Sequence, residues 1–125
     1  MTPIPRFLLA ALAASALLLA GVAVASAQGD HGTHKRPFDR EWNHNVSKKN
    51  KRWAKRVSRC ESGGNPNAIG AGGLYRGAFQ FSRPTWKTSP RSPGGDPIDY
   101  SYKTQGFVAV RLRMRAGASP WPNCG

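Results

Sequence analysis

The hydrophobic and polar positions divide this chain of 125 residues into three parts with different patterns. Residues 7–24 form an unbroken run of apolar and small residues, whereas residues 28–45 contain few aliphatic side chains. From residue 47 onwards, short apolar segments alternate with segments rich in glycine and proline. Because only this third part can bury a core, the pattern predicts one small domain over residues 47–125.

The N-terminal apolar run has the features of an export signal. Arg6 provides a short positive region before the run, and Ala25, Ser26 and Ala27 follow it as a small-residue cleavage site. We therefore predict a signal peptide over residues 1–27. The run is also long enough to cross a bilayer, so an uncleaved N-terminal helix that anchors the protein is the alternative.

Residues 28–46 are predicted to form a basic, disordered linker. The segment has too few aliphatic side chains to offset the entropy lost on ordering. His31 and His34 could bind a metal loosely, but two imidazoles without a third ligand make a weak site. We expect neither a metal nor a cofactor.

A helix is predicted to begin after Ser47, whose hydroxyl suits the N-cap position. Its apolar face is spaced at helical intervals and consists of Val46, Trp53, Val57 and Cys60. Glu61 falls at the C-terminal end of this helix, just before a glycine-rich stretch. The helix dipole is negative there, which favours the protonated form of a carboxyl group.

The later segments give weaker signals. Residues 78–81 alternate in polarity, which predicts that Phe79 and Phe81 face one side while Gln80 faces a cleft. A helix is expected to open at Pro84, and the prolines and glycines of residues 88–99 predict a loop. Residues 104–116 fit both helical and strand periods, and periodicity alone slightly favours a strand.

Charge separates the classes of partner. The formal net charge is +13, with 19 Lys and Arg against 6 Asp and Glu. The basic residues are concentrated between Lys35 and Arg59, where they either form a solvated surface or attract a polyanion. Since export argues against nucleic acid, we expect a secreted, wall-associated protein whose basic segment contacts anionic wall polymers.

Cys60 and Cys124 are the two cysteines of the chain. In a small domain routed to an oxidising compartment, a Cys60–Cys124 disulfide is the default interpretation. A zinc site and a reactive thiol are the alternatives, and no supporting ligands lie near either cysteine in the sequence.

Candidate proton donors are few. Between Trp53 and Gly125 the carboxylates are Glu61, Asp96 and Asp99, and this stretch contains no histidine. We therefore predict that Glu61, beside a cysteine at the end of a basic helix, is a catalytic acid. The alternative is that it is an ordinary surface residue at a helix terminus.

An ordered set of short motifs supports the catalytic interpretation. The set consists of Cys60 to Asn65, Tyr75, Gly77 to Phe81, Thr85 with Trp86, and Trp121 to Cys124. In this order the motifs resemble the transglycosylase-like domain of the resuscitation-promoting factors, cell-wall enzymes of the lysozyme superfamily. The resemblance covers residues 53–125. It implies a mainly α (α+β) class, a compact lysozyme-like domain with a minimal β element near residues 75–81, one disulfide, and a helix for residues 104–116.

The resemblance also implies a reaction on peptidoglycan glycan strands. Glu61 would act as general acid on the β-1,4 bond between N-acetylmuramic acid and N-acetylglucosamine. Attack by the sugar's own 6-hydroxyl would make the protein a lytic transglycosylase, and attack by water a muramidase-type hydrolase. A protein nucleophile would have to be Asp96 or Asp99, and we expect neither to serve.

Sugar-binding candidates and rival functions complete the interpretation. Aromatic faces and amide groups suit saccharide rings, so we predict substrate contacts from Tyr75, Gln80, Thr85 and Trp86. Core packing is the alternative role for Tyr75 and Trp86. A partner wall hydrolase is a further expected partner. The rival functions are a noncatalytic cationic cell-wall-binding module and a membrane-active cationic protein.

Overall fold

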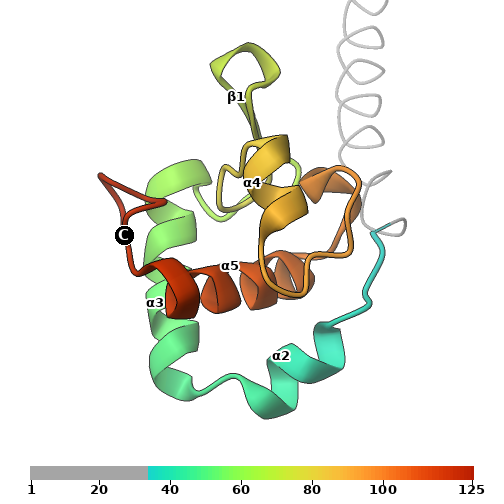
Figure 1. Cartoon of the computed structure of the whole chain (residues 1–125), viewed down its shortest axis with the longest axis vertical. Coiled ribbons are helices and arrows are strands. Elements are labelled where there is room, and N and C mark those ends of the chain that lie inside the picture. Colours follow the sequence, from blue (N-terminus) through green and yellow to red (C-terminus); the bar gives the residue numbers. More distant parts are fainter. Residues whose placement is uncertain (1–33) are drawn as a thin grey trace, which may run out of the picture. The chain divides into compact units, whose positions relative to one another are not determined.

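The computed structural model describes residues 34–125, which form a mainly helical domain with one small sheet (Figure 1). The fold class predicted from the sequence is confirmed. The elements in chain order are α2 (Asp39–Asn45), α3 (Lys48–Ser62), β1 (Ile69–Gly70), η2 (Ala71–Gly73), β2 (Tyr75–Arg76), α4 (Arg83–Thr88), η3 (Pro97–Asp99) and α5 (Tyr102–Ala116). Among these residues, no helix combines the length and the apolar character that a membrane span requires.

Helix α3 begins and ends where local chemistry dictates. The Ser47 side chain accepts a hydrogen bond from the Asn50 amide at 3.2 Å, which confirms the predicted N-cap. At the other end Gly63 adopts a left-handed conformation with φ of 67°, a conformation that glycine reaches without a steric penalty. The amides of Gly63 and Gly64 then bond to carbonyls of the last turn, so the helix stops just after Glu61.

Helix α5 crosses the middle of the domain and carries much of its core (Figure 1). The strand that periodicity slightly favoured for residues 104–116 is wrong, and the helix implied by the resemblance is confirmed. Residues 104–110 and Leu112 are all buried. A helix buried on several sides has no single apolar stripe, so its sequence lacks a clear 3.6-residue signal.

The predicted disordered linker is wrong over its second half, because residues 39–45 form α2. Few apolar residues are available there, but they are large and find partners on α5. The Phe38 and Phe107 ring centroids lie 4.9 Å apart, and Trp42 is only 8% exposed. A Cβ atom at Gly106 would lie 2.7 Å from the Trp42 ring, so this glycine permits the close approach. The predicted signal peptide and residues 28–33 lie outside the described residues.

The β element is a short antiparallel hairpin in which Ile69 pairs with Arg76 and Gly70 with Tyr75. It projects from the helices (Figure 1), and an isolated bridge from Arg76 to Phe81 extends it. The predicted minimal β element is therefore present, although it begins at Ile69 rather than near Tyr75.

The C-terminal segment is fastened to α3 by the predicted disulfide. Cys60 and Cys124 are bonded, with their Cα atoms 5.7 Å apart. Just before it, Trp121 is 4% exposed and its indole N–H donates to the Phe79 carbonyl at 3.0 Å. The indole also packs edge-on against Trp53 at 5.1 Å between ring centroids. The C-terminal segment thus holds the end of α3 through the disulfide and the Trp121 side chain.

Candidate active site

Glu61 lies in the last turn of α3, on the face that the helix buries. It follows Val57 by four residues and Ser58 by three, so it continues the stripe formed by these two buried side chains. At Glu61 the stripe reaches the surface, and the residue is half-buried. This burial raises the pKa of the Glu61 carboxyl above its ordinary value.

No Lys, Arg or His nitrogen within residues 34–125 lies within 4.0 Å of the Glu61 carboxylate. An opposite charge at that distance would lower the pKa and hold the group ionised. A partly buried carboxyl without such a partner is suited to carry a proton to a substrate.

The loop that contains Ala78 is bonded to α3 and α5 through the two backbone groups of Ala78. The Ala78 amide donates to Gln105 Oε1 at 2.8 Å, and the Ala78 carbonyl accepts from the Ser62 hydroxyl at 2.7 Å. Gln105 is completely buried in α5, and Ser62 directly follows Glu61. Ser62, the neighbour of Glu61 in the chain, therefore joins the end of α3 to the Ala78 loop.

Gln105 uses the two N–H groups of its amide to hold two further segments. Its Nε2 donates to the carbonyls of Pro66 and Tyr100 at 3.0 and 2.9 Å. One amide thus links the segment after α3, the Gly77–Ala78 turn and the start of α5. A Cβ atom at Gly77 would overlap the Gln105 side chain, so the glycine there allows the contact.

The two aspartates differ in their availability. Asp96 accepts from Arg76 Nε at 3.1 Å and Nη2 at 2.7 Å, from Arg83 Nη2 at 3.0 Å, and from the Ile98 amide at 3.2 Å. Burial raises the pKa of Asp96, but these hydrogen bonds and the arginine charges outweigh it and hold the pKa below its ordinary value. Asp96 therefore joins the hairpin to α4. Asp99 is exposed, and its backbone carbonyl accepts from the Lys35 amide.

The four predicted sugar-binding residues fall into different environments. Tyr75 is 42% exposed on β2, beside the exposed Leu74. Gln80 is half-buried, and its amide donates to the Gly77 carbonyl at 3.0 Å, so it braces the base of the hairpin. Thr85 is half-buried in the first turn of α4, where its hydroxyl oxygen accepts from Ser82 at 2.9 Å.

Trp86 belongs to the core. Its side chain has no exposed surface, its indole N–H donates to the Gly94 carbonyl at 3.0 Å, and its ring packs against Phe81 and Tyr100. A ring with no exposed face has none to offer a saccharide. The packing role, which was the alternative for Trp86, is the one that the structure has.

The family model for the transglycosylase-like domain matches residues 47–124. The chain belongs to the transglycosylase-like domain family. Its matched region contains Glu61, both cysteines and the hairpin, whereas α2 lies outside it.

Curated relatives of this transglycosylase-like domain include three resuscitation-promoting factors. RpfC of Mycobacterium tuberculosis is 39% identical over 69 residues, which cover 55% of this chain and 47% of the relative. RpfD of the same species is 37% identical over 68 residues, covering 54% and 42%. Rpf1 of Corynebacterium glutamicum is 38% identical over 73 residues, covering 55% and 36%. The chain thus spans less than half the length of these relatives. No solved structure matches it.

The sequence interpretation missed two residues of this transglycosylase-like domain. Ser62 and Gln105 hold the Ala78 loop, and the sequence interpretation gave neither side chain a role of its own. The signal for Gln105 was weak: it is an amide within a segment of mostly apolar and small residues. Two of its three backbone partners, Ala78 and Pro66, are distant in sequence.

Proposed function

We propose that this chain is a secreted peptidoglycan-cleaving enzyme in which Glu61 is the general acid. Its substrate is the β-1,4 bond between N-acetylmuramic acid and N-acetylglucosamine. The observation that carries the proposal is a half-buried carboxyl with a raised pKa at the end of α3, in a member of the transglycosylase-like family.

In the first step, Glu61 donates its proton to the glycosidic oxygen as the bond to the anomeric carbon breaks. The leaving N-acetylglucosamine departs with a hydroxyl group, and positive charge develops on the muramic acid ring. A raised pKa favours this step, since more of the carboxyl is protonated at a given pH.

In the second step, the ionised Glu61 accepts a proton from the attacking nucleophile. The 6-hydroxyl of the same sugar is the nucleophile that we favour, and its attack on the anomeric carbon gives a 1,6-anhydro product. Retention through a protein nucleophile would need a second carboxyl about 5–5.5 Å away. Asp96 is engaged by Arg76 and Arg83, so it is poorly suited to that role.

Substrate contacts are assigned by exposure. We propose that Tyr75 offers its ring face and Thr85 its hydroxyl to the glycan, and that Gln80 acts by holding the hairpin in place. The basic surface would concentrate the enzyme on anionic wall polymers, because long-range attraction raises the local concentration of a charged partner.

The decisive experiment is Glu61→Gln, assayed by mass spectrometry of digested sacculi. The amide keeps the size of the side chain but has no acidic proton to transfer. The rate of cleavage should therefore fall by about 10²-fold to 10⁴-fold. Asp99→Asn is the matched control, because it removes one exposed carboxylate of the same domain. Full cleavage by a folded Glu61→Gln protein would leave the noncatalytic wall-binding module as the function. Anhydro ends in the wild-type digest would identify the 6-hydroxyl route.

A further inference from the structure

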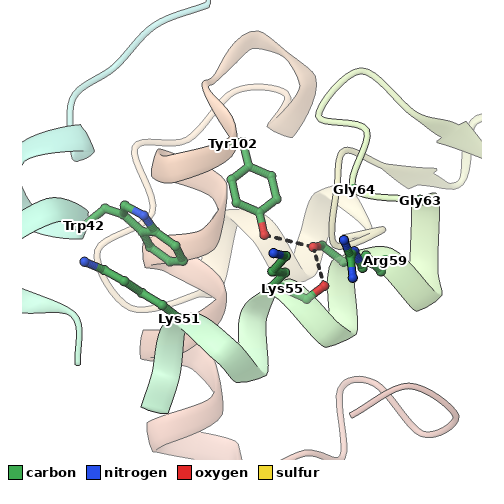
Figure 2. A pocket seen from close by; sticks show the side chains of 8 residues that line it. Trp42, Lys51, Lys55, Arg59, Gly63, Gly64 and Tyr102 are labelled. Carbon is green, nitrogen blue, oxygen red and sulfur yellow. Dashed lines mark hydrogen bonds between the residues drawn. The ribbon is translucent and has the colours of Figure 1, made fainter. Parts of the chain in front are cut away.

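A cavity of about 420 Å³ lies between α2, α3 and the start of α5 (Figure 2). Its exposed lining is mainly apolar, and its volume falls within the range of small-molecule sites. We call it the α2–α3 pocket; it is lined by Trp42, Lys51, Lys55, Ser58, Arg59, Gly63, Gly64 and Tyr102. Trp42 comes from α2, which precedes the region matched by the family.

The polar groups at the base of the pocket are already paired. The Ser58 hydroxyl donates to the Lys55 carbonyl at 3.2 Å, so the proton between Ser58 and Tyr102, at 2.9 Å, comes from the tyrosine (Figure 2). The Trp42 and Tyr102 rings pack edge to face, with their centroids 6.1 Å apart. The base therefore presents apolar surface to a ligand.

Three cations follow the rim at intervals of one helical turn. Lys51, Lys55 and Arg59 are four residues apart, so they share a face of α3 with a spacing of about 6 Å. Lys51 is occupied, because it donates to the Asn43 carbonyl at 3.0 Å and lies over the Trp42 ring at 5.9 Å.

Lys55 and Arg59 are exposed, and within residues 34–125 neither side chain has an ion pair or a hydrogen-bond partner. Two free cations above an apolar base are complementary to a ligand that has a small apolar body and negative groups. An acidic peptide with small aliphatic side chains has this composition, whereas a sugar or polyol phosphate polymer has a hydrophilic body.

The pocket is close to Glu61, and its base shares the face of Glu61 through Ser58, whereas Arg59 on its rim does not. Gly63 follows Glu61 by two residues, so their Cα atoms are at most about 7 Å apart. Arg59 precedes Glu61 by two residues, and helical residues at that spacing do not face the same way. A ligand in the pocket could thus be attached to a glycan at Glu61 without occupying its place.

We propose that the α2–α3 pocket binds an acidic peptide, with Lys55 and Arg59 contacting its carboxylates. This inference rests on the proposed function in one respect: the glycan strands of peptidoglycan carry short peptides with free carboxylates, and such a peptide is the occupant. The pocket would then recognise the peptide part of the polymer whose glycan part is cleaved at Glu61.

The test is an NMR titration of the chain with N-acetyl-Ala-Glu-Ala, which has two carboxylates, and with its neutral Ala-Gln-Ala amide counterpart. The acidic peptide should shift the Gly63 and Gly64 amides and the Trp42 indole N–H saturably, and the neutral one should not. Lys55→Gln with Arg59→Gln should weaken binding about tenfold or more, since hydrogen bonds to charged groups are lost.

The matched control is Lys49→Gln with Arg56→Gln. It also removes one lysine and one arginine charge, but from exposed positions of α3 outside the pocket. The affinity for the acidic peptide should stay nearly unchanged. Equal weakening in both double variants would mean diffuse attraction and would overturn the site. Absence of saturable shifts, or tighter binding of a poly(glycerol phosphate) chain at the same signals, would overturn the peptide as occupant.

Cleavage of glycan strands stripped of peptides separates this inference from the proposed function. On such strands the Lys55→Gln/Arg59→Gln variant should cleave like wild type, whereas Glu61→Gln should not cleave. If Glu61→Gln does cleave them, the proposed function fails and the titration still decides whether the pocket binds an acidic peptide. A pocket variant that is slow on stripped strands would show that its charges act on the glycan, against the inference.

Discussion

Replacing Gln105 by methionine removes the amide that holds three segments together near Glu61. Methionine has a similar length and no strong hydrogen-bonding group, so the change isolates the three bonds to Ala78, Pro66 and Tyr100. The bonds to Ala78 and Tyr100 are buried, and a buried backbone group left without a partner costs about 1–3 kcal/mol. The Pro66 bond is partly exposed and adds less, because water can replace it. We expect the free energy of unfolding to fall by about 3–5 kcal/mol.

Urea unfolding with the disulfide intact measures this loss. Gln80→Met is the control, because the Gln80 amide makes one short, partly buried hydrogen bond, to the Gly77 carbonyl. Losing this bond should lower the free energy of unfolding by about 1 kcal/mol. A Gln105→Met protein that loses no more than the Gln80 variant would refute the reasoning. It would mean that water enters and satisfies the backbone groups, so that Gln105 does not fix the Ala78 loop.

Four further predictions concern the helix end, the disulfide and α2. Because burial raises the pKa of Glu61 in the folded state, ionisation above the unfolded pKa of about 4.3 penalises folding. Glu61→Gln should therefore be more stable than wild type at pH 7, with the difference vanishing below pH 4 in parallel denaturation curves. For the same reason, cleavage should decline as pH rises through the folded pKa, and a rate that increases with pH would contradict the acid role. Replacing Cys60 and Cys124 by alanine should cost roughly 4 kcal/mol, as expected for opening a closed loop of this length, with a fall below 1 kcal/mol ruling out the entropic account. Gly106→Ala places a methyl group against the Trp42 ring and should cost about 1–3 kcal/mol. Proteolysis before residue 47 should become faster in this variant, and unchanged protection would show that α2 is held elsewhere.

Local chemistry in the sequence was sufficient for the parts of the site that depend on near neighbours. The N-cap at Ser47, the apolar spacing of Trp53 and Val57, and the glycine after Ser62 set the limits of α3, and with them the place of Glu61. The disulfide followed from the number of cysteines and the predicted export. These signals act over a few residues or on the whole composition, so they are present before the chain folds.

Tertiary structure decided what depends on which segments meet. Residues 104–116 form a helix whose first half is buried on several sides, and this burial removes the amphipathic pattern from the sequence. Residues 39–45 form α2, with Trp42 packed against Gly106 of α5. Trp86 lies in the core rather than at the surface, a choice that its local sequence left open. Gln105 bonds to Ala78 and Pro66, which lie 27 and 39 residues away in sequence. Periodicity and propensity carry no information about such distant partners, so the setting of Glu61 could be known only from the fold.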